Sequence, residues 1–445
     1  MIRRSTRSRG RAVGAALAAV SLMAGLAACS PGSSDPAPTG GTDQTSEEPD
    51  GTPDPVTLTL TTWGGEEDMD IWNERLARAE QALPWITVDH QQIPDDYDTV
   101  VGNRFAGNEA PDLMQLAENW AEFESLGRLA DLSSFLPDAT ERWSEAAVDS
   151  YSNENGFFAA PDRLGAMVVY YNKDLFDAAG LDYPASGWTW DDLRAAAIAT
   201  TDKEGPMADW TWGYAAGDWW PWVFSWIHQG GGAIVDDDGN PVVNSPEAIR
   251  GLQFYNDLVF VDEVAPSPVQ WEDLPVDGPD PLFNAGKLAM GATGFWQVGS
   301  LLGNSDLNWD VAPMPAGPGG AFTAPFGSGL AIASTSDKQE ASAELIKFLT
   351  SAEGQEPIAI AGHDVPASRD ALASDAFQNP SWNTADITLS VFEESAEILF
   401  RPPNGPYWGR IQDAFSNNLA DVWLNQRSVE DGLNDVQAEL ERVLR

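Results

Sequence analysis

The chain has 445 residues, with 69 acidic and 24 basic side chains and a formal charge of −45. A surface this acidic repels phosphate backbones, which excludes nucleic acid as a partner and argues against docking on anionic lipid through basic patches. The length is enough for two lobes with separate cores. Cys29 is the only cysteine, so the fold relies on packing rather than on disulfides.

The N-terminal segment has the layout of an export signal. Residues 1–28 carry five arginines followed by an apolar run that is short for a permanent membrane span. The run ends in Leu-Ala-Ala before Cys29, which resembles a bacterial lipobox. That resemblance implies that Cys29 is lipidated and becomes the first residue of the mature protein. The alternative is an ordinary secretory signal whose cysteine is incidental, which leaves an odd free thiol.

Residues 29–55 predict a disordered tether. From residue 30 to residue 55 the segment contains no aromatic and no branched aliphatic side chain, so it cannot bury enough surface to offset its ordering entropy. No later segment approaches the length of a transmembrane helix. We therefore expect a folded body that is held at a membrane surface only through the lipid on Cys29.

The body begins with the pattern of a βαβ unit. Residues 56–62 alternate apolar and polar side chains, as a strand does, and the apolar residues between 72 and 83 recur at spacings of four and three, as on a helix face. Another short strand is expected at residues 86–88. The pattern predicts an α/β fold with a parallel or mixed sheet.

Helix-capping signals support several later helices. Thr189 precedes two aspartates in a predicted first turn, and Ser245 precedes Pro246 at the first helical position. Ser336 and Gln339 have the spacing of a capping box.

Tryptophan is the most informative residue type for function. The chain has 19 tryptophans, and six of them lie between residues 210 and 226. An indole is large, is rarely fully buried and needs a partner for its N–H, so a core does not require such density. Indole faces beside carboxylates and amides form a good sugar site, because C–H faces stack on the rings and hydroxyls bond to the polar groups. Core packing is the alternative, both for the cluster and for each single tryptophan.

Several motifs in fixed order resemble one protein family. The motifs are YYNKDLF at 170–176, AGLD at 179–182, WTWDDL at 188–193, APDL at 110–113, GRLADL at 127–132, FNAGKLAM at 283–290 and GSGLAI at 327–332. Together they closely resemble the solute-binding lipoproteins of sugar ABC importers, the maltose-binding-protein-like class. The resemblance covers nearly all of the mature chain.

The resemblance implies a periplasmic-binding-protein fold, in which a hinge joins two α/β lobes around a ligand cleft. The expected N-lobe comprises residues 56–163 and 329–385, and the expected C-lobe comprises 164–328. Residues 386–445 are expected to form C-terminal helices on the C-lobe and hinge. The implied partners are a carbohydrate ligand and the transmembrane permease of an ABC transporter. We expect a monomer without a cofactor.

Site residues follow from the positions that match the family motifs. Tryptophans are expected to stack on the sugar, and the acids and the amide are expected to bond its hydroxyls. Trp296 and Trp408 are the strongest individual candidates. The crossing strand departs from the family, because it reads Asp-Arg-Leu-Gly at 162–165 where some relatives carry a ligand-facing carboxylate; Arg163 is expected either in a salt bridge or on the sugar. The expected ligand-binding residues are Trp63, Glu66, Glu67, Asn119, Trp120, Trp220, Trp222, Trp296 and Trp408.

Other functional classes fit the sequence less well. His90, His228 and His363 lack the HExxH spacing of a zinc site, and no Gly-x-Ser-x-Gly nucleophile elbow occurs. The acidic run at 236–240 places Ile234 and Ser245 where a calcium loop needs acids, so we expect a hairpin turn and no metal site. A surface-anchored glycan-active enzyme and a binding protein for a peptide, polyamine or polyol remain as alternatives to sugar binding.

Overall fold

The first two strands form the expected βαβ unit. Strand β1 (Val56–Thr62) pairs in parallel with β2 (Ile86–Gln92), and α1 (Glu66–Ala82) connects them. The alternation of β1 is reflected in its burial, since Leu58 and Leu60 are fully buried. Two apolar side chains of α1, Trp72 and Leu76, pack in the same core. The α/β prediction for the start of the body is confirmed.

The computed structural model describes residues 53–444, apart from 216, 237, 277, 384–386 and 404. The predicted signal segment, Cys29 and most of the tether therefore lie outside the described residues. The described residues belong to the unit Thr52–Arg445. Among them, no helix combines the length and the apolar character needed to cross a membrane.

A six-stranded mixed sheet organises the first lobe. Strands β1, β2 and β3 are parallel, whereas β12 runs antiparallel to both of its neighbours. In order across the sheet, the strands are β13 (Val365–Pro366), β6 (Ala160–Ala166), β12 (Pro325–Ile332), β3 (Leu113–Leu116), β1 and β2. The further elements of this lobe are α2 (Tyr97–Ala106), α3 (Trp120–Ser125), α4 (Ala139–Arg142), α5 (Glu145–Asp149), β4 (Ser152–Asn153), β5 (Gly156–Phe157), α13 (Gln339–Leu349), α14 (Ala352–Ala361), α15 (Arg369–Leu372) and α16 (Asp375–Gln378).

A three-stranded sheet organises the second lobe, with a core on each face. Its strands, in order, are β8 (Met290–Thr293), β7 (Val168–Asn172) and β9 (Trp309–Ala312). The further elements are α6 (Lys173–Ala179), α7 (Trp190–Thr200), η1 (Met207–Asp209), α8 (Trp220–Gln229), α9 (Pro246–Phe260), α10 (Pro268–Asp273), α11 (Pro279–Asn284), α12 (Trp296–Leu302), β10 (Ala316–Gly317), β11 (Gly320–Ala321), α17 (Ser390–Ala396), α18 (Trp408–Trp423) and α19 (Val429–Val443).

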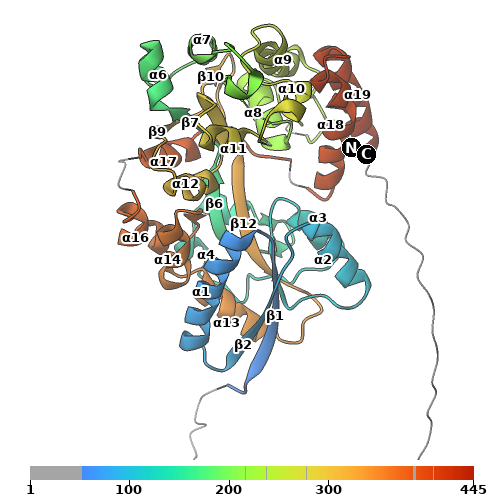
Figure 1. Cartoon of the computed structure of the whole chain (residues 1–445). Coiled ribbons are helices and arrows are strands. Elements are labelled where there is room, and N and C mark those ends of the chain that lie inside the picture. Colours follow the sequence, from blue (N-terminus) through green and yellow to red (C-terminus); the bar gives the residue numbers. More distant parts are fainter. Residues whose placement is uncertain are drawn as a thin grey trace, which may run out of the picture. The chain divides into compact units, whose positions relative to one another are not determined.

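The chain passes between the two sheets along β6 and β12. Strand β6 ends at Ala166 and β7 begins at Val168, so one residue separates the two sheets along the chain. Strand β12 pairs with β6 from its first residue, and Figure 1 shows β12 as the long orange strand that leads into the lower sheet. The two-lobe α/β fold class is confirmed, whereas the lobe boundaries 56–163, 164–328, 329–385 and 386–445 stay a prediction.

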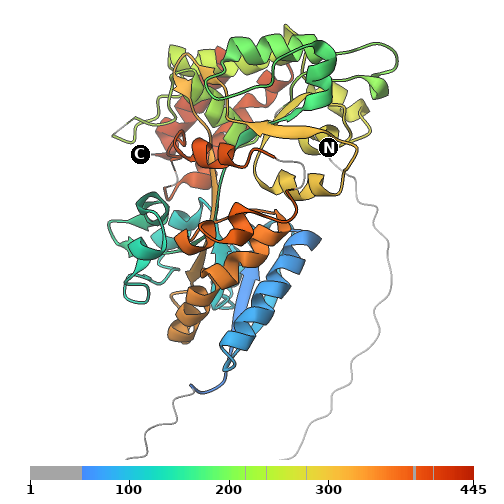
Figure 2. The ribbon, with the colours of Figure 1, turned by 90° about the vertical axis from the view of Figure 1, so that its left-hand side faces the viewer.

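Segments that are distant in the sequence complete the first lobe. Helix α1 lies against α13 and α14, and Figure 2 shows the blue helix beside the orange ones. Leu345, Ile346 and Leu349 of α13 are fully buried in the core that also holds Trp72. The first lobe is therefore built from two separate stretches of chain, as the family resemblance implies.

Two of the three expected caps form. The Thr189 hydroxyl accepts from the N–H of Asp192, and the Ser245 hydroxyl accepts from the N–H of Ala248. The capping box at Ser336 is wrong, because its hydroxyl donates to Asp112 Oδ1 at 2.6 Å and α13 begins three residues later, at Gln339. A tertiary partner outcompetes the local cap in this case.

A fully buried ion pair ties α1 to β6. Arg75 Nη2 lies 2.5 Å from Asp162 Oδ1, and neither side chain has any exposed surface. Arg75 also donates to the carbonyls of Gly354 and Leu349, so α1, β6 and the α13–α14 region share one guanidinium. Loss of one partner would leave the other charge buried and unpaired.

We expect Asp162→Asn to lower the free energy of unfolding by about 3 kcal/mol, because it leaves the buried Arg75 charge uncompensated. Urea unfolding followed by circular dichroism measures this. Glu344→Gln is the control, since its pair with Lys347 is exposed and is expected to contribute less than about 1 kcal/mol. A loss below about 1 kcal/mol for Asp162→Asn would show that the pair does not anchor the strand.

Candidate functional site

Aromatic rings gather around Phe326, the second residue of β12. The ring of Trp296 lies edge-on to Phe326 at 4.8 Å between centroids, and that of Trp219 lies nearly parallel to it at 5.7 Å. Trp220 contacts the same ring at 6.3 Å. We call these four residues the Phe326 cluster. It brings the tryptophan-rich segment and the first turn of α12 together on a strand that connects the lobes.

The rings of the cluster and their neighbours differ in exposure. Trp219 is 44 % exposed, and Trp296 and Trp222 are half-buried. Trp220 and Trp408 are buried and meet edge to face at 5.1 Å. The open indole surface therefore comes from Trp219, Trp222 and Trp296, while Trp220 and Trp408 pack behind them.

Hydrogen bonds hold the two half-buried indoles. Trp296 Nε1 donates to Asp280 Oδ2 at 3.3 Å, and Trp222 Nε1 donates to the carbonyl of Ala292 at 2.7 Å. A Cβ on Gly294 would lie 2.0 Å from the Trp296 ring, so any residue other than glycine at this position would clash with the ring. With their N–H groups satisfied, these rings offer their apolar faces to a ligand.

A group of charged side chains lies on β6, on α1 and directly before β13; we call Arg163, Asp68, His363 and Asp364 the Arg163 group. Arg163 Nη1 lies 2.9 Å from Asp68 Oδ1 and 3.9 Å from Asp364 Oδ2. His363 Nε2 lies 3.1 Å from the same Asp68 oxygen. Burial opposes ionisation of Asp68, but the hydrogen bond from His363 and the charge of Arg163 lower its pKa to about 2. Burial raises the pKa of Asp364 to about 6.

The salt bridge expected of Arg163 is present, and the guanidinium keeps further capacity. Its side chain is only 5 % exposed, and among the described residues Nε and Nη2 have no hydrogen-bond partner. Buried donors of this kind are costly unless something accepts from them. The salt-bridge role of Arg163 is therefore present, and its role on a sugar stays a prediction.

A second acidic group lies at the end of β3 and in α3. Burial raises the pKa of Glu118 to about 7, with a smaller contribution from the charge of Asp98. The Asn119 side chain hydrogen-bonds to Asp98. The Glu122 carboxylate accepts from the N–H of Gly409 at 2.6 Å and thereby links α3 to the first turn of α18.

The remaining N-lobe candidates lie in different surroundings. Trp63 is half-buried and edge-on to Tyr97 at 5.3 Å, and Glu66 is exposed at the start of α1. The side chain of Glu67 lies outside the described part of the chain. Trp120 is buried and donates to the carbonyl of Ser150, so it packs in the core. Within the described residues, the ring contacts of Trp63 and Trp120 are with other aromatic residues and not with the Phe326 cluster.

The sequence interpretation did not select four residues that the structure places in this region. Phe326 lies in β12 and Asp364 directly precedes β13, and the pairing of these strands with β6 is not visible in the sequence. Asp280 is separated from Trp296 by an intervening strand. Trp219 belongs to the tryptophan-rich segment, of which the sequence predicts only Trp220 and Trp222 as ligand contacts. Tryptophan density was the only available signal.

The acidic run after Ile234 closes a turn. Asp236 Oδ1 accepts from the N–H groups of Asp238 and Asn240, and Val235 bridges to Pro241. Among the described residues, no cluster of three or more His, Cys, Asp or Glu side chains is arranged to hold a metal ion.

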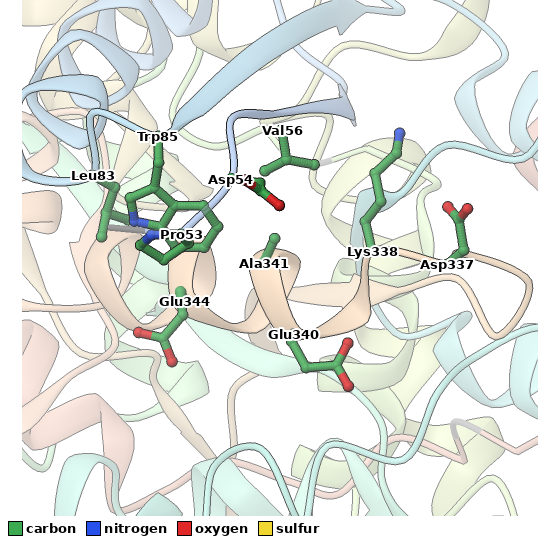
Figure 3. Close-up of a pocket in the computed structure, with 10 residues that line it drawn as sticks. All are labelled: Pro53, Asp54, Val56, Leu83, Trp85, Asp337, Lys338, Glu340, Ala341 and Glu344. Atoms are coloured by element: carbon green, nitrogen blue, oxygen red, sulfur yellow. The ribbon is translucent and has the colours of Figure 1, made fainter. Parts of the chain in front are cut away.

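A cavity of about 600 Å³ lies elsewhere, between the start of β1 and α13. Figure 3 shows Trp85 and Leu83 on one side of it, and Lys338 and Asp337 on the other. It contains one aromatic ring and none of the residues expected to bind ligand, so we do not assign it to the solute.

Comparison with known proteins identifies the family. Residues 64–356, well over half of the chain, match the family described as bacterial extracellular solute-binding protein. The chain belongs to this family. The resemblance to solute-binding proteins that the sequence motifs indicated is confirmed. Because the family is extracellular, the protein acts outside the cytoplasm.

Individual relatives and solved structures resemble the chain over most of its length. An arabinooligosaccharide-binding protein of Halalkalibacterium halodurans is 25 % identical over 76 % of this chain and 77 % of its own length. The structure of an ABC substrate-binding protein from Listeria monocytogenes in complex with cycloalternan has a TM-score of 0.79 at 25 % identity, covering 88 % of this chain and 99 % of that one. UgpB from Mycobacterium tuberculosis, in complex with glycerophosphocholine, has a TM-score of 0.74 at 19 % identity, covering 88 % and 98 %.

The raised pKa of Glu118 predicts a pH dependence of stability. Its pKa is about 7 in the folded protein against 4.5 in the unfolded chain, so the folded state holds the proton between these values. Stability from this group is therefore greatest below pH 4.5 and falls as pH rises through 7, by up to about 3 kcal/mol. We expect Glu118→Gln, which cannot ionise, to gain stability relative to the wild type from pH 5 to pH 8.

Chemical unfolding of both proteins at pH 5 and pH 8 measures the difference. Glu344→Gln, a change on the exposed face of α13, should keep the pH trend of the wild type. An equal stability difference between wild type and Glu118→Gln at the two pH values would contradict the predicted titration.

Proposed function

We propose that this solute-binding protein binds a mono- or oligosaccharide outside the cytoplasm and delivers it to the permease of an ABC transporter. The observation that carries the proposal is the Phe326 cluster with its open indole faces beside buried carboxylates and an arginine with unpaired donors. Apolar C–H faces of a sugar stack on such rings while its hydroxyls exchange hydrogen bonds with the charged groups. The relatives named for arabinooligosaccharide and solved with cycloalternan support the same ligand class.

Closure of the lobes would couple binding to delivery. The Phe326 cluster belongs mainly to the second lobe and the Arg163 group to the first. A solute that contacts both groups would stabilise the closed arrangement, in which the two lobes lie closer together. A permease that recognises both lobes in that arrangement would then select the loaded protein. The solute needs only to be bound and released, without any bond being broken.

A glycan-active enzyme is the second candidate function, and one observation favours it. Glu118 and Asp364 both have pKa values raised into the range that suits a general acid. Against it, the family consists of solute-binding proteins. Incubation with oligosaccharides followed by mass spectrometry of the sugars separates the two: recovery of intact ligand supports binding and delivery, and products that disappear with Glu118→Gln support an enzyme.

The fold alone leaves the solute open, since a neighbour of the same fold was solved with glycerophosphocholine. A thermal-shift panel of mono- and oligosaccharides, peptides, polyamines and polyols tests the class, because a ligand selective for the folded state raises the melting temperature. We expect a sugar to give the largest shift. A peptide or a polyamine as the only stabilising solute would reject the proposed ligand class.

We expect Trp296→Ala and Trp219→Ala each to weaken the affinity for the best sugar about tenfold or more, because each removes a stacking face. Trp408→Ala tests the remaining strong candidate from the sequence; because that ring is buried, its effect on the melting temperature is measured alongside. Isothermal titration calorimetry gives the affinities. Trp423→Ala is the matched control, a half-buried tryptophan that contacts Tyr255 instead. Unchanged affinity in both Trp296→Ala and Trp219→Ala would remove the cluster from the site.

We also propose that the protein is a monomer anchored to the outer face of the cytoplasmic membrane through lipid on Cys29. Two acyl chains suffice for stable anchoring. We expect Cys29→Ser to move the protein from the membrane fraction to the medium, as measured by immunoblotting of both fractions. Ser30→Ala serves as the control and should remain with the membrane. Retention of Cys29→Ser in the membrane fraction would contradict the anchor.

A further inference from the structure

Two neighbouring strands and the residue before a third place an aromatic residue, a glycine and an acid in one row. Phe326 of β12 pairs with Gly165 of β6, and on the other side of β6 the pairing of Val365 with Leu164 brings Asp364 beside Gly165. A Cβ on Gly165 would lie 3.6 Å from the Phe326 Cβ and 3.9 Å from Asp364 Oδ1. All three residues therefore border the same small volume on one face of the sheet.

Neither the backbone nor the packing requires glycine at position 165. Its φ is not in the left-handed region, and the contacts of an added Cβ would be ordinary van der Waals distances. Gly329 on the adjacent strand differs, because a Cβ there would lie 2.8 Å from the Ala159 Cβ. What glycine provides at position 165 is space: with strands about 4.8 Å apart, the flanking side chains stand about 10 Å apart across a bare stretch of backbone.

The groups that border this space complement a sugar ring. On one side, Trp296 packs edge-on against Phe326 and supplies apolar surface. On the other side, Asp364 is mostly buried and Arg163 keeps two buried nitrogens without a partner among the described residues. Asp364 Oδ1 accepts from the N–H of Val365, and its Oδ2 lies 3.9 Å from Arg163 Nη1. Both oxygens of a carboxylate can accept more than one hydrogen bond, so capacity remains for hydroxyls.

We propose that Gly165 holds open a subsite for one sugar ring, which lies over the β6 backbone between Phe326 and Asp364. The ring rests its apolar face against Phe326 and Trp296 and donates hydroxyl protons to Asp364, whose position Arg163 helps to hold. Asp364, directly before β13, supplies the acceptor that β6 itself lacks at this position. The space above Gly165 thus limits the size of the ring that can bind, and Asp364 selects for a ring that carries hydroxyl groups. The inference rests on the proposed function and specifies its ligand contacts.

Graded filling of the gap tests the subsite. With the best sugar from the thermal-shift panel as probe, we expect Gly165→Ala to weaken affinity about tenfold and Gly165→Val to weaken it further, because each added carbon occupies the place of the ring. The melting temperature without sugar should stay within a few degrees of the wild type, since the added Cβ meets no close contact. Gly303→Ala is the matched control, because a Cβ there meets nothing within 4 Å.

Asp364→Asn provides a second variant that adds no volume. We expect it to lower affinity by fivefold or more, since a carboxylate accepts hydroxyl protons more strongly than an amide oxygen does. Wild-type affinity in both Gly165→Val and Asp364→Asn overturns the subsite while leaving sugar binding intact. If the wild type responds to no sugar in the panel, the proposed function itself fails, and the subsite fails with it.

Discussion

The antiparallel pairing of β6 with β12 is the constraint on which the rest of the structure depends. Both strands belong to the six-stranded sheet at one end, and both lead into the second lobe at the other. Their register sets Gly165 opposite Phe326 and Arg163 opposite Ser328, before a bulge between Ser328 and Gly329 shifts the pairing. A slip of one residue would turn every side chain of β12 to the opposite face. The aromatic and charged halves of the site would then no longer share a surface.

The buried ion pair between Arg75 and Asp162 fixes the position of β6 relative to α1 and thereby supports this register. Asp162 lies next to Arg163 in β6, and its carbonyl accepts from Gln355 of α14. Arg163 Nε lies 3.8 Å from Asp162 Oδ2, and both side chains contact α1, Asp162 through Arg75 and Arg163 through Asp68. The ion pair that stabilises the first lobe thus also orients the arginine that borders the proposed subsite. Desolvation makes such a pair a weak source of net stability, so its main effect is positional.

Much of the fold follows from local patterns. The alternation at 56–62 and the caps at Thr189 and Ser245 are properties of short segments, and the structure reproduces them. The capping box at Ser336 failed because Asp112, which is more than 200 residues distant in the chain, binds the same hydroxyl. Local propensity decides a cap only where no tertiary partner competes.

The sequence predicted which residue types form the candidate site, but not which individual residues are exposed there or which of them lie together. Tryptophan density indicated a stacking surface, yet it could not separate the open ring of Trp219 from the buried rings of Trp220 and Trp408, because exposure depends on what α18 packs against. Phe326 and Asp364 gain their importance from strand pairing across long sequence separations. Such register is a property of the assembled sheet, and no motif within either segment encodes it.

The contact between Glu122 and Gly409 bears on how a solute influences the lobes. Glu122 lies in α3, whose apolar residues pack in the first core, and Gly409 lies in the first turn of α18, whose apolar residues pack in the second. The positive end of a 16-residue helix favours this carboxylate. Because the bond uses no solute atom, it stabilises the approach of the lobes independently of any solute. The solute shifts the equilibrium only by contacts that differ between the open and closed arrangements. Those contacts must involve groups of both lobes. In the subsite that we propose, Asp364 before β13, Gly165 of β6 and Phe326 of β12 are the residues that would supply them.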